Sequence, residues 1–505
     1  MNPLPLNVHT AEQVRALDRH AVEALQIPSY VLMTRAGQAA FALVQACWPS
    51  ARRIVIVCGP GNNGGDGYVL ARIAREHGLD VDVMALAAPE RLRADARRAW
   101  EDHLAAGGSV QAWDASRIEG ADLIVDAIFG TGLSRPVDAG LAECIRAINA
   151  SPAPTLALDI PSGLHADTGR VLGAAVAAER TLAFIGLKLG YYLGEGPNHA
   201  GIVTFDDLSV PTQVRAQVDA AARRIPEHLL AQLLPPRARM AHKGLHGHVL
   251  VLGGGQGMAG AARLAGEAAL RSGAGRVTIA TRTENVAAIV GGRPELMCRG
   301  VAGREEVDAL TASADLLAIG PGLGQDAWAQ TLFEAALASA KPAIVDADGL
   351  NLLARSPRAR QAWVLTPHPA EAGRLLGKTA SQVQDDRLGA AREIAARYGA
   401  TVVLKGAATL VAEGGALASI CDRGNPGMAT AGMGDVLTGI IAGIAAQTRD
   451  RPGSLPDAAR AGVLAHAMAG DLAARHGERG LLASDLYPYL PTCLNPAQHP
   501  RSPSA

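Results

Sequence analysis

The chain has 505 residues, which exceeds one typical hydrophobic core and predicts at least two domains. Hydrophobic residues make up 49% and charged residues 19%, an ordinary globular balance, and the formal net charge of -1 gives no global field that would favour nucleic acid or an anionic membrane. The six cysteines are scattered without metal-ligand spacing, and we find no apolar leader and no membrane-length apolar run, so we expect reduced thiols and a cytoplasmic protein.

The first part of the chain alternates short apolar runs with helix-sized segments. Thr10-Ala11-Glu12-Gln13 matches a capping box and predicts the start of a helix. The apolar runs are nearly continuous, as in parallel strands that are covered by helices on both faces. This pattern predicts an α/β domain with a doubly wound, Rossmann-like parallel sheet. The predicted strands are Ile54–Cys58, Val81–Leu86, Leu123–Ile128, Thr155–Ile160, Thr181–Ile185 and Ile202–Phe205.

A proline- and charge-rich stretch then separates two alternating series. We place the first domain at 1–212, the linker at 213–224, the second domain at 225–493 and a disordered tail at 494–505. The second series again predicts an α/β domain, with its longest helices near the end, at Asp435–Gln447 and Ala458–His476. Its predicted strands are Val249–Leu252, Arg276–Ala280, Leu316–Ile319, Ala343–Val345, Trp363–Thr366 and Thr401–Leu404.

A glycine-rich segment, Gly59–Gly67, directly follows the first predicted strand, and we expect a helix from about Gly67. Backbone N–H groups at a helix N-terminus attract phosphate oxygens, and glycine lets a ligand approach that backbone closely. The spacing formally matches the GxGxxG dinucleotide fingerprint. However, Asp80 and Asp82 lie at the start of the next strand, whereas a dehydrogenase needs an acid at its end. An ordinary dehydrogenase is therefore disfavoured.

Polar residues follow other strands of this domain. Asp126 precedes Gly130–Pro136, and Asp159 and Ser162 follow the next strand. Because carboxyl ends of parallel strands meet in one crevice, Asn63, Asp126 and Ser162 would bring hard oxygen ligands there for an alkali or alkaline-earth cation. Asp159 would face a ligand as a possible base. Any one of these residues alone would only indicate a turn, but three clusters after strands favour a site.

These segments resemble the NAD(P)H-hydrate epimerase family over about residues 1–210. The resemblance implies a hydrated nicotinamide nucleotide as substrate, a K⁺ ion held by Asn63, Asp126 and Ser162, and Asp159 as the catalytic residue in contact with substrate. The substrate-binding residues that it implies are Asn62, Asn63, Gly64, Gly65, Asp66, Gly130, Thr131, Gly132, Leu133, Ser134, Arg135, Pro136 and Asp159.

A second glycine-rich segment, Asn425–Asp435, precedes the first of the two late helices. Backbone amides of its Gly432-Met433-Gly434 turn can stabilise developing negative charge. Asp435, at the helix start, can accept a proton from a substrate hydroxyl. Lys405–Thr409 follows a strand and offers a cation and a hydroxyl to a nucleotide phosphate. Two more strand-to-helix junctions carry similar turns, at Gly320–Gly324 and Thr366–Glu371.

These motifs resemble the ribokinase-like fold, and more closely the ADP-dependent NAD(P)H-hydrate dehydratase family, over about residues 225–490. The resemblance implies ADP as co-substrate with Mg²⁺, and Asp435 as the base that activates the ring hydroxyl of the (S)-hydrate. The products are then NAD(P)H, AMP and phosphate, and the first domain interconverts the (R)- and (S)-hydrates. The implied substrate contacts are Ala261, Gly322, His368 and Asp435, and the implied nucleotide contacts are Lys405, Gly406, Ala407, Ala408, Thr409 and Gly434.

Three features of the sequence each have two possible interpretations. Lys188 is a candidate for the first pocket, but an exposed or phosphate-pairing lysine is as consistent with its context. His368 is equally consistent with ligand contact and with a cap or turn. Gly373–Thr379 resembles a P-loop but has one residue too few between its glycines and follows a helical stretch, so we predict a helix C-cap there.

Two rival functions stay open at this point. One is a ribokinase-like small-molecule kinase with an attached regulatory domain, which would leave a phosphorylated product instead of releasing phosphate. The other treats the first domain as a non-catalytic nucleotide-binding module. In every case we expect small-molecule substrates, no nucleic-acid or membrane partner, and association into a homo-oligomer.

Overall fold

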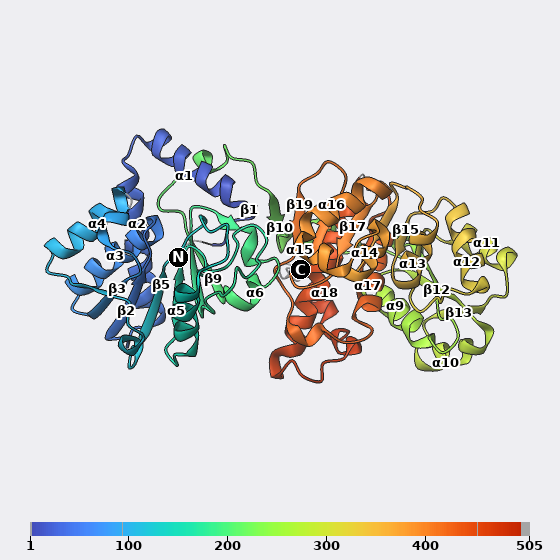
Figure 1. Ribbon diagram of the computed structural model, residues 1–505. Helices are drawn as coiled ribbons and strands as arrows, with labels where there is room; N and C mark the ends of the chain where they lie inside the picture. The colour runs from blue at the N-terminus through green and yellow to red at the C-terminus, as the bar shows by residue number, and fades with distance from the viewer. Residues whose placement is uncertain (1–2, 93, 452, 496–505) are drawn as a thin grey trace, which may run out of the picture. The chain divides into compact units, whose positions relative to one another are not determined.

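The computed structural model describes residues 3–92, 94–451 and 453–495, and the chain divides into two compact units between Arg223 and Arg224 (Figure 1). The segment predicted as a linker therefore belongs almost entirely to the first unit, and it begins within the short helix α7 (Thr212–Arg215). Of the predicted tail, Leu494 ends helix α19 (Leu490–Leu494), and residues 496–505 lie outside the described residues.

The first unit is built on a parallel sheet with the strand order β4-β3-β2-β5-β6-β7-β9. The chain runs outward from β2 to β3 and β4, and then returns to β5 on the other side of β2. This reversal is the switch point beside which ligands bind in doubly wound sheets. The strands are β2 (Arg53–Cys58), β3 (Asp80–Ala85), β4 (Val110–Ala112), β5 (Leu123–Ala127), β6 (Thr155–Leu158), β7 (Arg180–Phe184) and β9 (Ile202–Asp206).

Helices cover both faces of this sheet. Ile54 and Ile56 of β2 pack with α2 and α3, whereas Val55 and Val57 pack with α5 on the opposite face. This burial on both faces is the reason for the continuous apolar runs in the sequence. The helices are α1 (Ala11–Leu25), α2 (Ser29–Cys47), α3 (Asn62–Glu76), α4 (Ala94–Ala105), α5 (Ala139–Ala150) and α6 (Gly196–His199).

The N-terminal helix α1 starts as the sequence predicts. Thr10 Oγ1 accepts a hydrogen bond from the Gln13 N–H at 3.2 Å, and Gln13 Oε1 accepts one from the Thr10 N–H at 2.9 Å. Before it, β1 (Asn7–His9) pairs in parallel with β8 (Leu187–Lys188) and antiparallel with β10 (Ala222–Arg224). The pairing with β8 places the end of β1 next to Lys188.

The second unit contains a sheet in the order β13-β12-β11-β14-β15-β16-β17-β18-β19, parallel from β13 to β17 and antiparallel thereafter. The six strands that the sequence predicts are all present. The sequence does not predict β13, β18 and β19. The strands are β11 (His248–Leu252), β12 (Arg276–Thr281), β13 (Met297–Gly300), β14 (Leu316–Ile319), β15 (Ala343–Val345), β16 (Trp363–Leu365), β17 (Thr401–Leu404), β18 (Leu410–Ala412) and β19 (Ala418–Ile420).

A hydrophobic core of this unit joins one face of the sheet to α9, α17 and α18. The apparent P-loop is a helix end, as predicted, because Gly377 caps α14 in a left-handed conformation with φ 71°. The helices are α8 (His228–Leu233), α9 (Ala259–Arg271), α10 (Val286–Gly292), α11 (Arg304–Ser313), α12 (Ala327–Ala338), α13 (Ala347–Arg355), α14 (Pro369–Leu376), α15 (Ala380–Asp385), α16 (Arg387–Tyr398), α17 (Met433–Thr448) and α18 (Ser454–Ala473).

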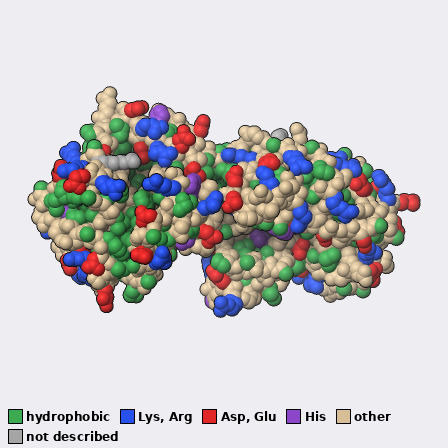
Figure 2. Space-filling model, in the orientation of Figure 1, with side chains coloured by type: hydrophobic (Ala, Val, Ile, Leu, Met, Phe, Trp, Pro, Cys, Tyr) green, Lys and Arg blue, Asp and Glu red, His purple; other side chains and the backbone are tan. Residues whose placement is uncertain are grey.

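The fold thus confirms a mixed α/β architecture with parallel sheets in both units. On the face seen in Figure 2, acidic and basic side chains are intermixed, in keeping with the net charge of -1. Among the described residues, no helix has the length and apolar character needed to span a bilayer.

Candidate active sites

The first glycine-rich segment is mostly helix and not loop. Helix α3 begins at Asn62, so the prediction of a start near Gly67 is wrong. The reason is packing: a Cβ on Gly64 would clash with the carbonyl oxygen of Gly59, and one on Gly65 would lie 2.6 Å from Met33 Sδ. These glycines therefore allow the first turn of α3 to pack closely against Gly59 and Met33. The backbone N–H groups of this turn, which have no partner within the helix, lie at the carboxyl end of β2.

The predicted cation ligands meet at that end of the sheet. Asp126, which is fully buried, accepts hydrogen bonds from Ser162 Oγ at 2.6 Å and from the Ser162 N–H at 2.7 Å. The Phe129 N–H donates to Ser162 Oγ at 2.9 Å, and the next residue, Gly130, lies against Asn63. Both polar atoms of the buried Asn63 amide lack a partner in the described residues. Such an unsatisfied amide is costly unless a ligand completes it.

Asp159 lies beside this group and is held from two sides. Its side chain forms an ion pair with Lys188, and its carbonyl oxygen accepts a hydrogen bond from the Tyr191 hydroxyl. A Cβ on Gly130 would lie 3.1 Å from Asp159 Oδ2, so this carboxylate borders the Gly130–Pro136 loop. Asp159 also has a left-handed backbone, with φ 64°. Strained backbone of this kind is concentrated at functional sites.

Lys188 is neither exposed nor free to pair with a distant phosphate. Its side chain is 0% exposed, and its Nζ donates to Asp159 and, at 3.3 Å, to the carbonyl oxygen of Phe184. The structure therefore contradicts the exposed interpretation and places Lys188 beside Asp159.

The remaining predicted substrate residues of this unit divide into buried and open groups. Asn63, Gly64, Gly65 and Asp66 are buried, and burial, with the charge of Asp159, raises the pKa of Asp66 well above its usual value. The open residues offer access from solvent. They are Asn62, Gly132, Ser134, Arg135 and Pro136, which are exposed, and Gly130, Thr131 and Leu133, which are partly exposed.

In the second unit, Lys405 connects the predicted nucleotide segment to the N-terminus of α17. Its Nζ donates to Asp346 Oδ1 at 2.6 Å and lies 3.7 Å from Glu371 Oε2. A Cβ on Gly434 would lie 3.3 Å from the same Nζ. The positive charge is thus held against the Gly432-Met433-Gly434 turn, where the N–H groups of α17 begin.

Asp435 lies in the first turn of α17, next to this cluster. Burial, with the charge of Asp346, raises the pKa of Asp435 to about 7, while Lys405 opposes the shift. A carboxyl group with a pKa near neutrality is suited to general-base chemistry at neutral pH.

His368 is the N-cap of α14. Its Nδ1 accepts hydrogen bonds from the N–H groups of Ala370 at 3.1 Å and Glu371 at 3.4 Å, which requires an unprotonated Nδ1. Burial lowers the pKa of His368, in agreement with a neutral ring. Its side chain is nevertheless 47% exposed, so the cap role is compatible with ligand contact.

The other predicted residues of this unit are placed as follows. A Cβ on Gly322 would lie 3.0 Å from the Ala261 side chain, so these two positions are adjacent. Gly406 and Ala407 are exposed, and Ala408 and Thr409 are partly exposed. Thr409 Oγ1 donates to the Gly406 carbonyl oxygen at 3.0 Å, which closes the segment into a turn.

Two further residues hold central positions, although the sequence assigns neither an individual role. Asp346 is 1% exposed and joins Lys405 to the Thr438 hydroxyl, which donates to its Oδ2 at 2.8 Å. Asp346 belongs to a segment that resembles the dehydratase family, and it directly follows β15, at a strand end where ligands meet. Thr438 lies inside an apolar helical stretch, and no local signal marks it.

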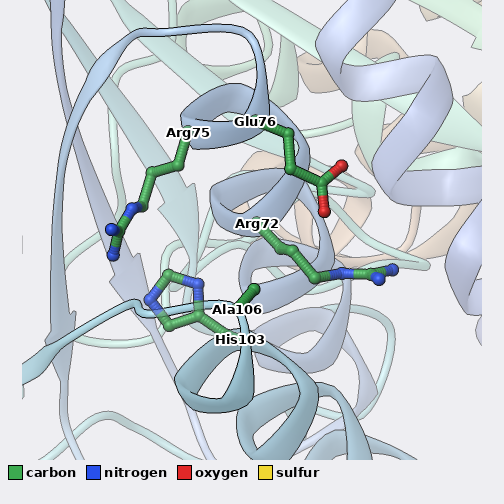
Figure 3. A pocket seen from close by; sticks show the side chains of 5 residues that line it. All are labelled: Arg72, Arg75, Glu76, His103 and Ala106. Atoms are coloured by element: carbon green, nitrogen blue, oxygen red, sulfur yellow. The ribbon is translucent and has the colours of Figure 1, made fainter.

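A cavity elsewhere does not contain any of these residues. It has a volume of about 110 Å³ and is lined by Arg72, Arg75 and Glu76 of α3 with His103 and Ala106, at the C-terminal ends of α3 and α4 (Figure 3). Arginines at helix C-termini complement the helix dipole, so their presence there needs no ligand.

Each of the two α/β units places buried acidic groups and a lysine beside a helix N-terminus, the arrangement of a two-domain α/β protein suited to binding phosphorylated ligands. A model of NAD(P)H-hydrate dehydratase matches residues 249–492, and a model described as the YjeF-related protein N-terminus matches residues 29–190. These two matches correspond to the second and the first unit.

Similar proteins cover nearly the whole chain. It is 46% identical to the bifunctional NAD(P)H-hydrate repair enzyme Nnr of Coxiella burnetii, over 96% of this chain and 98% of that protein. Identity to the enzyme of the same name from Escherichia coli is 44%, over 98% and 95%. The crystal structure of the hypothetical protein SMU.573 from Streptococcus mutans aligns with 54% of this chain and 98% of its own, at 29% identity and a TM-score of 0.50.

The chain therefore belongs to the family of bifunctional NAD(P)H-hydrate repair enzymes. Its first unit is the NAD(P)H-hydrate epimerase domain, and its second unit is the NAD(P)H-hydrate dehydratase domain.

Proposed function

We propose that the second unit transfers the terminal phosphoryl group of ADP to the ring hydroxyl of (S)-NAD(P)H hydrate, with Asp435 as the base. The observation that carries this proposal is the position of Lys405, which is fixed by Asp346 against the N-terminus of α17 beside Asp435. A cation and free backbone N–H groups stabilise phosphoryl oxygens, and a neighbouring base activates the attacking hydroxyl.

The chemistry follows from the poor leaving ability of hydroxide. Asp435 takes the hydroxyl proton as the oxygen attacks the β-phosphorus of ADP, and AMP departs. The C–O bond then breaks, phosphate leaves with the electron pair, and loss of a proton from the neighbouring ring carbon restores the double bond. Mg²⁺ would be held mainly by the nucleotide phosphates, because the described residues include no cluster of His, Cys, Asp and Glu that could hold a metal.

The direct test supplies hydrated NADH with ADP and Mg²⁺ and follows recovery of the absorbance of the reduced nicotinamide. Release of one phosphate and one AMP per NADH supports the proposal. A stable phosphorylated product would instead support the ribokinase-like kinase with a regulatory domain.

The dehydration rate should depend on pH through Asp435. Because burial raises the pKa of this group to about 7, the ionised base predominates only above that value. We therefore expect kcat to rise about tenfold per pH unit below 7 and to level off above it. A steady-state pH profile with the (S)-hydrate tests this. A rate that stays constant from pH 5 to pH 8 would contradict the assignment of Asp435 as base.

We propose for the first unit that Asp159 moves protons while the hydroxyl leaves the ring carbon and water returns on the opposite face. Asn63, Asp126 and Ser162 would hold K⁺, which fits the unpartnered Asn63 amide and the oxygen donors beside it. The bound ion would supply positive charge near the substrate oxygens. Lys188 would hold Asp159 in its strained conformation.

Epimerisation should therefore require K⁺. Dialysis into Na⁺ or tetramethylammonium buffer is expected to lower the epimerisation rate at least about tenfold, and K⁺ should restore it. In Asn63→Ala this response to K⁺ should be lost. Exchange between the two hydrates can be followed by chromatography, with dehydration of the pure (S)-hydrate as control. Equal epimerisation rates in all three buffers would exclude K⁺ from the reaction.

A further inference from the structure

Arg387 is a buried cation in the dehydratase unit. It is the first residue of α16 and is 5% exposed. Its Nη1 donates to Gln384 Oε1 at 2.9 Å, and its Nη2 lies 3.4 Å from the carbonyl oxygens of Leu404 and Lys405. Its Nε has no partner in the described residues. Within the described parts of the chain, the guanidinium thus contacts only neutral oxygens.

This position is unfavourable for an isolated positive charge. No carboxylate of the described residues offsets the desolvation of Arg387, which lowers its pKa to about 10. The residue also lies at a helix N-terminus, where the helix dipole disfavours a cation. A buried charge without a counter-charge destabilises a fold, so its presence calls for a compensating interaction.

The backbone next to the guanidinium belongs to the segment proposed to bind the nucleotide. A Cβ on Gly406 would lie 2.6 Å from Arg387 Nη1, and Gly406 has φ 140°, so only glycine fits between this cation and the surface. Gly406 itself is exposed. One peptide layer therefore separates the buried charge from the surface where Lys405–Thr409 would meet a ligand.

We propose that Arg387 is a positioning residue for the nucleotide: it fixes the Lys405–Gly406 peptide and provides the uncompensated positive charge that favours a phosphorylated ligand over an uncharged nucleoside. The proposal rests on the nucleotide-binding role of Lys405–Thr409. Arg387 differs from Lys405, which has the carboxylates of Asp346 and Glu371 beside it. The arriving phosphates would be the missing counter-charge.

The test compares ADP with adenosine, which has the same base and sugar but no phosphate. Binding of each to the full chain is measured by calorimetry in the presence of Mg²⁺, for wild type, Arg387→Gln, Arg387→Lys and the exposed control Arg397→Gln on the same helix. We expect Arg387→Gln to weaken ADP binding about tenfold and adenosine binding less than about twofold. The control should change neither.

Arg387→Lys keeps the charge but loses the planar contact with the carbonyl oxygens. We expect both ligands to bind more weakly to it, with their affinity ratio within about twofold of wild type. This variant decides the question if Arg387→Gln fails to fold. Equal weakening of ADP and adenosine in Arg387→Gln, or a tenfold fall of the ratio in Arg387→Lys, would overturn the proposal. If wild type itself does not bind ADP, it is the proposed function of the segment that fails.

Discussion

Replacing Asp435 by asparagine is expected to reduce dehydration of the (S)-hydrate by two to four orders of magnitude, roughly the contribution of a well-placed general base. Asparagine keeps the size and the hydrogen-bonding reach of the side chain but cannot accept the hydroxyl proton. The epimerisation rate should stay at the wild-type level, because the epimerase domain is a separate compact unit.

Loss of folding would not explain such a result. Since the pKa of Asp435 is raised in the folded protein, the wild type is destabilised as pH rises from the unfolded value toward about 7, when this carboxyl ionises. An amide avoids that cost, so the variant should melt at an equal or higher temperature at pH 8. Asp450→Asn, which changes an exposed carboxylate, is the control. Regeneration of NADH by Asp435→Asn at the wild-type rate would disprove the assigned base.

Replacing Asp159 by alanine is expected to abolish epimerisation and to leave dehydration intact. With a mixture of both hydrates, the variant should rapidly repair only the (S) share, and the rest should follow at the spontaneous epimerisation rate. The measurement is the amplitude of the fast phase of NADH recovery.

The single substitution also leaves Lys188 buried without its partner, which costs about 3–5 kcal/mol. The double variant Asp159→Ala, Lys188→Met removes both charges and separates chemistry from folding. It should be better folded than the single variant and equally unable to epimerise. Complete conversion of the mixture by the double variant, faster than spontaneous exchange, would show that Asp159 is not needed.

The parallel sheets were predictable because strands that are buried on both faces consist of nearly continuous apolar residues, a pattern that is visible in the local sequence. Val55 and Ile56 face opposite layers of helices, so both must be apolar. Such a strand can therefore be recognised from its own residues, without knowing which strands lie beside it. The β18–β19 hairpin was harder to predict, because Ser419 at the centre of β19 interrupts the apolar run that marks the other strands. The first turn of α3 was misassigned because its glycines have low helix propensity, which tight packing around Gly64 overrides.

The candidate sites were predictable where a residue follows a strand, and less so where a partner comes from far along the chain. The sequence placed Asp126 and Ser162 in one cluster, and in the structure Ser162 Oγ donates a hydrogen bond to Asp126. Lys405 was expected to face the nucleotide, but its contact with Asp346, 59 positions away, depends on the order of the strands. The contacts of the Thr438 hydroxyl and of the Arg387 side chain likewise arise only from tertiary packing, so the local sequence does not predict them.

The left-handed backbone at Asp159 has a consequence for protein engineering. A residue with a Cβ at φ 64° costs folding free energy, of the order of 1–3 kcal/mol, that glycine would recover. Routine thermostabilisation, which places glycine at such positions, is reasonable at the exposed Gln26 and Ser209, with φ 51° and 59°. At residue 159 the same change would relieve the backbone but leave Lys188 buried without its partner, and that cost of about 3–5 kcal/mol exceeds the gain, so a screen scored on heat resistance would reject glycine there and retain the carboxylate.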